Sequence, residues 1–303
     1  LAQLLAVHEE SVRIKNLGLE ADAALAVGML YNDVGKPTEA TSYCNKSIEL
    51  YEQLQDSTGL IAGNHALSNL YRLLQQDRKA LTYLHNALSI AQLTNTDQTG
   101  FILSDIGTVY TYLGDFAQAH DYLDQAAVYY ELNEDHENRT KVLYRRAKVY
   151  LYQGNYTASQ QVSEEALRVS RSIRCPNLQS KIIFMLAAIK QEQLEQTEAI
   201  KLFKQGVAIR DTWKQDVFTA YALSEVGSLF LDRHLQDSAL HYYDAALAVC
   251  TQHNLTDYEQ VIIANLGAKL IGSGQYASAL DYLYKALWFA DSTGNEHRIA
   301  SLK

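Results

Sequence analysis

The 303-residue chain repeats one spacing of residue sizes seven times. In each unit a small residue is followed three positions later by a large one, then by small residues twelve and nineteen positions after the first. The first small residues lie 40, 39, 40, 40, 40 and 40 positions apart, at Gly28, Ser68, Gly107, Ala147, Ala187, Gly227 and Gly267. A register kept over seven units predicts an array that grows by stacking similar units.

Each unit is predicted to be two antiparallel helices, A and then B. Small side chains let two helix backbones approach where they cross, and the large residue fills the space beside them. We therefore expect the tyrosines at the large position, such as Tyr31, Tyr71 and Tyr110, to pack between helices. Glycines recur where helix A should turn into helix B, at Gly35, Gly114, Gly154 and Gly274. A left-handed residue is favoured at such a helix end.

The small-aromatic-small-small signature, as in Ser68, Tyr71, Ala80 and Ala87, resembles that of the tetratricopeptide-repeat family, and the likeness extends over residues 1–303. That family has a usual period of about 34 residues. The longer period here is similar to the long-repeat subclass of kinesin light chain and the sensor arrays of bacterial regulators. The resemblance implies an all-α, right-handed superhelical solenoid of about seven antiparallel helix pairs. Lys190 takes the large apolar position of the fifth unit, so we expect a local irregularity there.

We expect one solenoid over residues 1–303. Residues 1–17 are predicted to be a lone helix B, and residues 296–303 the start of a further helix. The repeat units between them are predicted at about 20–58, 60–98, 99–138, 139–178, 179–218, 219–258 and 259–295. The chain begins at Leu1 and stops inside a predicted helix, so we expect it to be a fragment of a longer protein.

Composition restricts the classes of partner. The formal net charge is −9, and an acidic chain does not favour direct nucleic-acid binding, which needs a basic face. No run of 18 apolar residues is present, so we expect no membrane span. Cys44, Cys175 and Cys250 are far apart and form no CxxC pair, which predicts neither a disulfide framework nor a zinc site. We expect Cys44 and Cys250 to be buried and the protein to be cytoplasmic.

Catalytic motifs are missing from the sequence. It contains no GxxxxGK[ST], GxSxG or HExxH, and its nine histidines have no metal-ligand spacing. We therefore expect no catalytic residues, no metal and no cofactor, and predict that this segment is not an enzyme.

Helical geometry places the residues at −6, −3, +1 and +4 from the first small residue on one stripe of helix A. The resemblance implies that this stripe lines a concave groove where peptides bind. Its centre is predicted to be basic and aromatic, which suits an acidic or carboxylate-bearing segment. The candidate ligand-binding residues are His65, Asn69, Arg72, Phe101, Lys141, Tyr144, Arg145 (adjacent to the stripe), Lys148, Lys181, Phe184 and Tyr221.

The leading hypothesis is a protein- or peptide-binding scaffold or sensor array that relays occupancy to a flanking output domain. One alternative is a structural array that self-associates into a homo-oligomer. Another is a small-molecule-sensing repeat domain of a bacterial signalling or transcription regulator. The stripe could also be only a solvated face. An adjacent helix-turn-helix, kinase or cyclic-dinucleotide synthase would favour a sensor, whereas further repeats would favour a scaffold.

Overall fold

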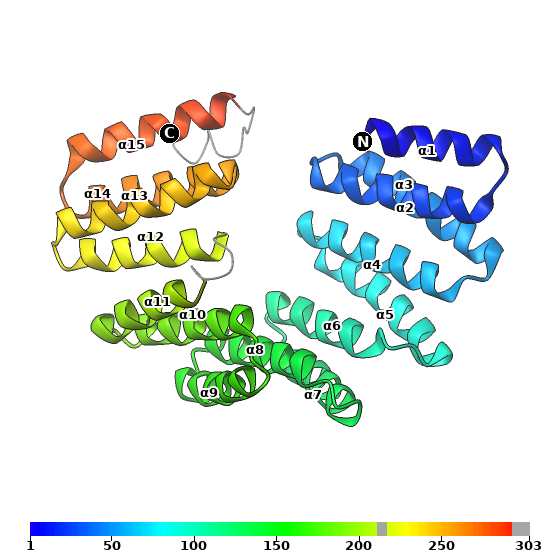
Figure 1. Cartoon of the computed structure of the whole chain (residues 1–303), viewed down its shortest axis with the longest axis horizontal. Coiled ribbons are helices and arrows are strands. Elements are labelled where there is room, and N and C mark those ends of the chain that lie inside the picture. The colour runs from blue at the N-terminus through cyan, green and yellow to red at the C-terminus, as the bar shows by residue number, and fades with distance from the viewer. Residues whose placement is uncertain (211–216, 293–303) are drawn as a thin grey trace. The chain divides into compact units, whose positions relative to one another are not determined.

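The computed structural model describes residues 1–210 and 217–292, except for the side chains of residues 210, 285–286 and 289–292. The chain forms two compact units, unit 1 (residues 1–153) and unit 2 (residues 154–303), which are described separately. Both consist of helices, and the described residues contain no strand (Figure 1). The predicted all-α class is therefore confirmed. The expected single solenoid with its unit boundaries stays a prediction, and residues 296–303 lie outside the described ranges.

The helices are of similar length, as a regular repeat requires. Unit 1 contains α1 (Ala2–Arg13), α2 (Leu17–Asp33), α3 (Pro37–Leu54), α4 (Ser57–Leu73), α5 (Asp77–Thr94), α6 (Thr99–Leu113), α7 (Phe116–Leu132) and α8 (His136–Tyr152). Unit 2 contains α9 (Tyr156–Ser172), α10 (Pro176–Glu192), α11 (Gln196–Arg210), α12 (Val217–Asp232), α13 (Gln236–Gln252), α14 (Thr256–Gly272) and α15 (Tyr276–Ser292).

Within each unit every helix packs against the next one along the chain. The even-numbered helices are the predicted A helices, and they also contact one another, α2 with α4 and α6 with α8 in unit 1, and α12 with α14 in unit 2. Side chains on successive A helices therefore share a surface, which we call the A-helix face. Residues about one repeat apart in the sequence therefore lie next to each other on this face.

Small residues sit where an A helix meets its B helix. A Cβ atom built on Gly107 would lie 2.7 Å from Leu123 and 3.1 Å from the carbonyl oxygen of Ala119. At Gly227 the corresponding distances are 2.7 Å to Tyr243 and 3.1 Å to the carbonyl oxygen of Ala239. Backbone oxygens move only with their helix, so a larger side chain would push the pair apart. The predicted close helix crossings are confirmed.

The large positions stack on aromatic residues of the B helix. Tyr71 stacks on Tyr83 with ring centres 5.4 Å apart, and Tyr110 stacks on Tyr122 at 5.5 Å. Tyr31–Tyr43 and Phe230–Tyr242 repeat the arrangement. Each pair is separated by twelve residues in the sequence, and each joins the two helices of one repeat. The tyrosines therefore serve as packing residues, as predicted.

The turns follow the predicted chemistry. All four predicted glycines have left-handed backbones, with φ between 72° and 78°. Lys190 was expected to disturb the packing of its repeat, but α10 and α11 are continuous helices. Its ammonium lies 3.0 Å from Glu195 Oε1 and also donates to Gln193. These polar contacts replace the missing aromatic stack within the two helices. Residues 211–216 of the same predicted unit lie outside the described residues, so a local irregularity around this unit stays a prediction.

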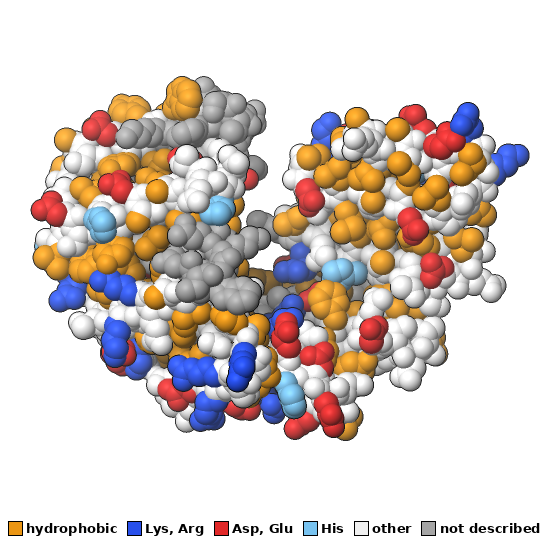
Figure 2. Space-filling view, viewed as in Figure 1, with side chains coloured by type: hydrophobic (Ala, Val, Ile, Leu, Met, Phe, Trp, Pro, Cys, Tyr) orange, Lys and Arg blue, Asp and Glu red, His pale blue; other side chains and the backbone are white. Residues whose placement is uncertain are grey.

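The first and last described helices expose apolar side chains (Figure 2). On α15, Tyr276, Leu280 and Tyr284 are spaced by four residues, and more than half of each side chain is exposed.

Both predicted buried cysteines, Cys44 and Cys250, are in the core. Among the helices described, none combines the length and the apolar character that crossing a membrane demands.

Candidate functional site

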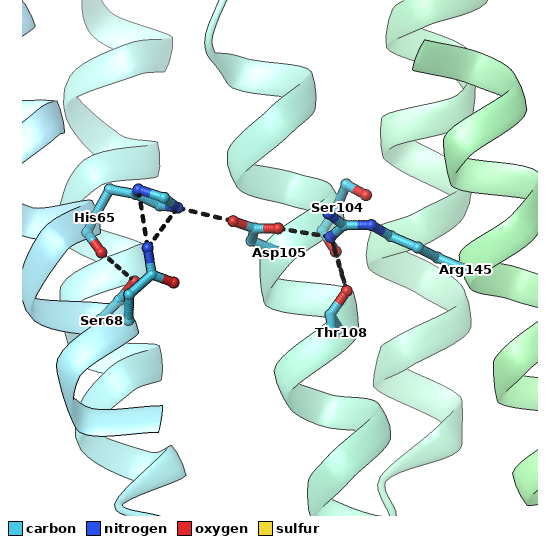
Figure 3. Close-up of polar contacts among 7 residues, drawn as sticks. His65, Ser68, Ser104, Asp105, Thr108 and Arg145 are labelled. Atoms are coloured by element: carbon cyan, nitrogen blue, oxygen red, sulfur yellow. Dashed lines mark hydrogen bonds and ion pairs between the residues drawn. The ribbon is translucent and has the colours of Figure 1, made fainter. Parts of the chain in front are cut away.

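A buried carboxylate joins three A helices of unit 1. Asp105 of α6 lies between His65 of α4 and Arg145 of α8, and only 9% of its side chain is exposed (Figure 3). His65 Nε2 is 2.9 Å from one carboxylate oxygen, and Arg145 Nη1 is 2.6 Å from the other. An ionised carboxylate only accepts hydrogen bonds, so both neighbours donate. The three side chains form a continuous polar network across the A-helix face.

Arg145 is fixed by more than its ion pair. The same nitrogen, Nη1, lies 2.9 Å from the carbonyl oxygen of Ser104 and 2.8 Å from the hydroxyl of Thr108. All of these contacts are to α6, on either side of Asp105. The guanidinium is therefore held against the preceding repeat, and its charge is matched by a carboxylate.

The other end of the network is partly aromatic. The His65 ring packs on Phe101 with ring centres 4.9 Å apart. The side-chain amide of Asn69 lies 3.4 Å from His65 Nδ1. In the neutral imidazole whose Nε2 donates to Asp105, Nδ1 is the acceptor nitrogen, and the amide of Asn69 can donate to it. Four predicted site residues, His65, Asn69, Phe101 and Arg145, are thus brought into one network.

The network shifts the acidity of its central group. Burial on its own would raise the pKa of Asp105, but the hydrogen bond from His65 and the charge of Arg145 outweigh burial and hold this pKa below its ordinary value. Asp105 is therefore ionised at neutral pH, and Arg145 contributes little net positive charge to the face.

A second cluster on the same face is centred on Tyr112, whose side chain is about half exposed. Arg72 Cζ and Lys148 Nζ each lie 5.7 Å from the centre of the Tyr112 ring, so the two cations are no farther apart than twice that distance. Lys148 also lies 5.6 Å from the ring centre of Tyr152. Within the part of unit 1 that the structure describes, neither cation forms an ion pair with a carboxylate.

The aromatic neighbours of Lys148 favour its charged form. Burial would lower the pKa of its ammonium, but Tyr112, Tyr152 and Tyr144 outweigh this effect and raise the pKa above its ordinary value. Arg72, Asn69 and Tyr112 also line an open pocket of about 460 Å³ on this face. We call Arg72, Tyr112 and Lys148 the cation–tyrosine cluster. It provides two positive charges beside an exposed aromatic ring.

Unlike Lys148, Lys141 forms an ion pair within its own helix. Its ammonium lies 2.7 Å from Glu137 Oε1, one helical turn earlier, and donates to Asn138. Of the three cations expected together on α8, Lys141 and Arg145 are therefore paired with carboxylates, and Lys148 keeps its charge available.

The remaining predicted residues belong to unit 2. Phe184 of α10 is 5% exposed and packs in the core beside Phe203, with ring centres 6.2 Å apart. Tyr221 of α12 is half-buried against the edge of the same Phe203 ring. Lys181 Nζ lies 4.8 Å from the ring centre of Phe218. Phe184 and Tyr221 thus contribute mainly to packing in unit 2.

The predicted stripe on helix A does not include Asp105 or Tyr112. Asp105 is two positions before its small residue, next to the stripe, and is 40 residues from both His65 and Arg145. Asp105 and Arg145 occupy equivalent positions in consecutive repeats and have opposite charges. That combination was a detectable signal for a contact between repeats. Tyr112 is one position beyond the stripe and carried no comparable signal.

Comparisons with known proteins identify the repeat. A tetratricopeptide-repeat model matches residues 59–131, and a second model of that repeat matches residues 21–54 and 140–173. A comparison with curated proteins finds no match. The described residues contain no group of three or more histidines, cysteines or acids that could hold a metal ion.

Solved structures share the fold at low identity. The nearly identical TPR-like repeats of a putative kinesin light chain from Podosopora anserina match with 17% identity and a TM-score of 0.53, covering 63% of this chain and 94% of that one. A Rap protein complexed with competence and sporulation factor gives 13% identity, a TM-score of 0.64, and coverages of 99% and 90%. NprR in complex with its cognate peptide NprX matches with 14% identity and a TM-score of 0.61, covering 90% of this chain and 82% of that one. Over residues 21–54, 59–131 and 140–173 the repeat matches and the helix pairs agree, so these parts of the chain are tetratricopeptide repeats.

Proposed function

We propose that this chain is a non-catalytic scaffold that binds a protein or peptide segment on its A-helix face. The cation–tyrosine cluster of unit 1 would take an acidic or carboxylate-bearing part of that segment. The observation that carries the proposal is the position of Arg72 and Lys148, which both lie 5.7 Å from the Tyr112 ring centre. NprR, a neighbour in fold, was solved with its cognate peptide, which supports a peptide as the class of ligand.

The chemistry of the cluster suits a carboxylate. The planar guanidinium of Arg72 can donate two parallel hydrogen bonds to such a group, and the ammonium of Lys148 adds a second charge. The exposed ring of Tyr112 offers an apolar surface to the neighbouring part of the ligand. The His65–Asp105–Arg145 network holds α4, α6 and α8 together. The helices that carry the cation–tyrosine cluster are therefore held in place before a ligand binds. Pre-organised donors lose less conformational entropy on binding.

We further propose that occupancy of this face is transmitted to a flanking output domain. The three A helices that carry the cluster are linked by the network, so a ligand that bridges Arg72 and Lys148 favours one spacing of these helices. A ligand shifts an equilibrium only by its differential affinity for the two states. Transmission therefore requires that the ligand bind one spacing of the repeats more tightly.

The test uses peptide binding measured by fluorescence anisotropy. We expect the chain to bind members of a peptide library with free C-terminal carboxylates more tightly than the same peptides with amidated ends. Affinity should fall as salt rises, because exposed charges are screened over about 8–10 Å at physiological ionic strength. The double variant Arg72→Glu/Lys148→Glu should weaken binding at least about tenfold, with helical content unchanged.

A matched control separates this site from general charge effects. Arg168→Glu/Arg171→Glu changes the net charge equally on exposed positions of α9. This control should retain affinity for the carboxylate peptides. If both double variants bind as the parent does, the cluster is only a solvated face, and the self-association hypothesis moves ahead.

A further inference from the structure

Unit 2 contains a polar pocket that none of the preceding arguments uses. It has a volume of about 690 Å³, within the usual range of ligand sites. Its walls come from the A helices α10, α12 and α14, together with Tyr243 of α13 and with His234 and Ser273 of the adjoining turns. Glu225 of α12 is among the lining residues, together with Gln191 of α10 and Lys269 of α14. Three elements therefore present polar groups to one space.

The charges in this pocket do not balance. Lys269 Nζ lies 2.7 Å and 3.0 Å from the two carboxylate oxygens of Asp232, so this pair is mutually neutralised. Glu225 is half-buried and receives a hydrogen bond from the amide of Gln191 at 3.1 Å, while no cation pairs with it among the described residues. A carboxylate has about four acceptor positions. Glu225 therefore has unused capacity to accept hydrogen bonds from a ligand.

The environment of Glu225 disfavours its charge. Burial raises the pKa of Glu225 above its ordinary value, the bond from Gln191 and the charge of Lys269 offset part of the effect, and the charge of Asp232 adds to it. Other titratable groups near it are the hydroxyls of Tyr243 and Tyr258, and the imidazole of His234 lines the same pocket. A cation placed beside Glu225 would favour the ionised form and relieve this cost.

We propose that this pocket binds a protonated amine or guanidinium group, with Glu225 as its charged anchor. The hydroxyl of Ser224 donates to the carbonyl oxygen of Tyr221 at 2.8 Å, which leaves its oxygen able to accept from the ligand. Leu231 and Ala268 line the same space and offer apolar contact to a methylene stem. A small diffusible amine and a lysine or arginine side chain of a partner share this chemistry.

The experiment uses two probes on the full chain. The first is agmatine, a small molecule with a guanidinium and an amine. The second is a capped glycine peptide with one central arginine. Binding is followed by isothermal titration calorimetry, and the ionisation of Glu225 by carbon NMR of glutamate labelled at the side-chain carboxyl, with Glu225→Gln identifying the signal. Tighter binding of the peptide would assign the pocket to a partner side chain, and tighter binding of agmatine to a diffusible amine.

If the inference is right, at least one probe saturates the parent chain and lowers the measured pKa of Glu225 by about one, which corresponds to about tenfold tighter binding to the ionised form. Glu225→Gln should weaken that binding about tenfold. The control Glu198→Gln, at a partly exposed carboxylate that pairs with Lys201 on α11 outside the pocket, should not. Binding should also weaken as the pH falls through the pKa of Glu225.

The proposal is overturned if neither probe changes the titration of Glu225, or if the parent and Glu225→Gln bind equally. Glutamine has the shape of the neutral acid that burial already favours, so we expect the variant to fold, and circular dichroism checks this. Arg72→Glu/Lys148→Glu should leave agmatine binding unchanged, and Glu225→Gln should leave carboxylate-peptide binding unchanged. Failure of either site is thus distinguishable from failure of the other.

Discussion

Replacing Asp105 by asparagine should destabilise unit 1 by about 2 kcal/mol at neutral pH. Asparagine keeps the shape, and its oxygen can still accept from Arg145, but its amide only donates, so the bond to His65 survives only if the imidazole adopts the tautomer whose Nε2 accepts. The variant loses the negative charge of the Asp105 carboxylate. Hydrogen bonds to charged groups contribute about 1.5–3 kcal/mol and neutral ones about 0.5–1.5. Two weakened bonds therefore suggest a loss of about 1–3 kcal/mol, because Arg145 keeps its bonds to Ser104 and Thr108.

The matched control is Asp124→Asn. Asp124 also pairs with an arginine, Arg146 at 3.2 Å, but 55% of its side chain is exposed, compared with 9% for Asp105. Exposed ion pairs contribute about 0–1 kcal/mol, so this variant should be nearly neutral. Urea unfolding followed by circular dichroism measures both variants, and hydrogen exchange shows whether the loss is concentrated in α4, α6 and α8. Such localisation is expected, because repeats contact only their neighbours.

The pH dependence gives a second check. The folded-state pKa of Asp105 is depressed, so its stabilisation is fully present above the unfolded pKa of about 3.9 and is lost as the pH falls through the folded value. The difference between the parent and Asp105→Asn should therefore shrink in acid. Equal urea midpoints for the two proteins at neutral pH, or a difference that persists unchanged in acid, would refute the reasoning about a buried charged network.

Two further predictions concern the core. Ala119→Leu or Ala246→Leu should lower the free energy of unfolding by about 1–3 kcal/mol through overpacking, because both side chains are fully buried; unchanged thermal unfolding would contradict the tight crossings. Burial raises the pKa of the Cys44 and Cys250 thiols to about 11, so both should resist iodoacetamide at pH 8, whereas the half-buried Cys175 should react first. Mass spectrometry of the alkylated native chain checks this order, and early labelling of Cys44 would show that the site opens.

The repeat architecture was readable from the sequence because it depends on short-range packing that recurs in every unit. A small residue at Gly107 and a large one at Tyr110 determine how helix A meets helix B, and the same chemistry acts again 40 residues later. The glycine turns and the Tyr110–Tyr122 stack follow from the same period. Because the same local packing recurs in every unit, it produces a periodic residue pattern that can be recognised in a single sequence.

The character of the A-helix face was decided by tertiary structure. Sequence position placed Arg145 and Lys148 together in one basic centre, but the structure pairs Arg145 with Asp105 and leaves Lys148 beside Tyr112. Likewise, no motif marks Glu225, whose role depends on which neighbours reach it from α10 and α14. The free energy of a charge depends on burial and on partners from other repeats. These are set by side-chain direction across helices, which a single sequence does not specify.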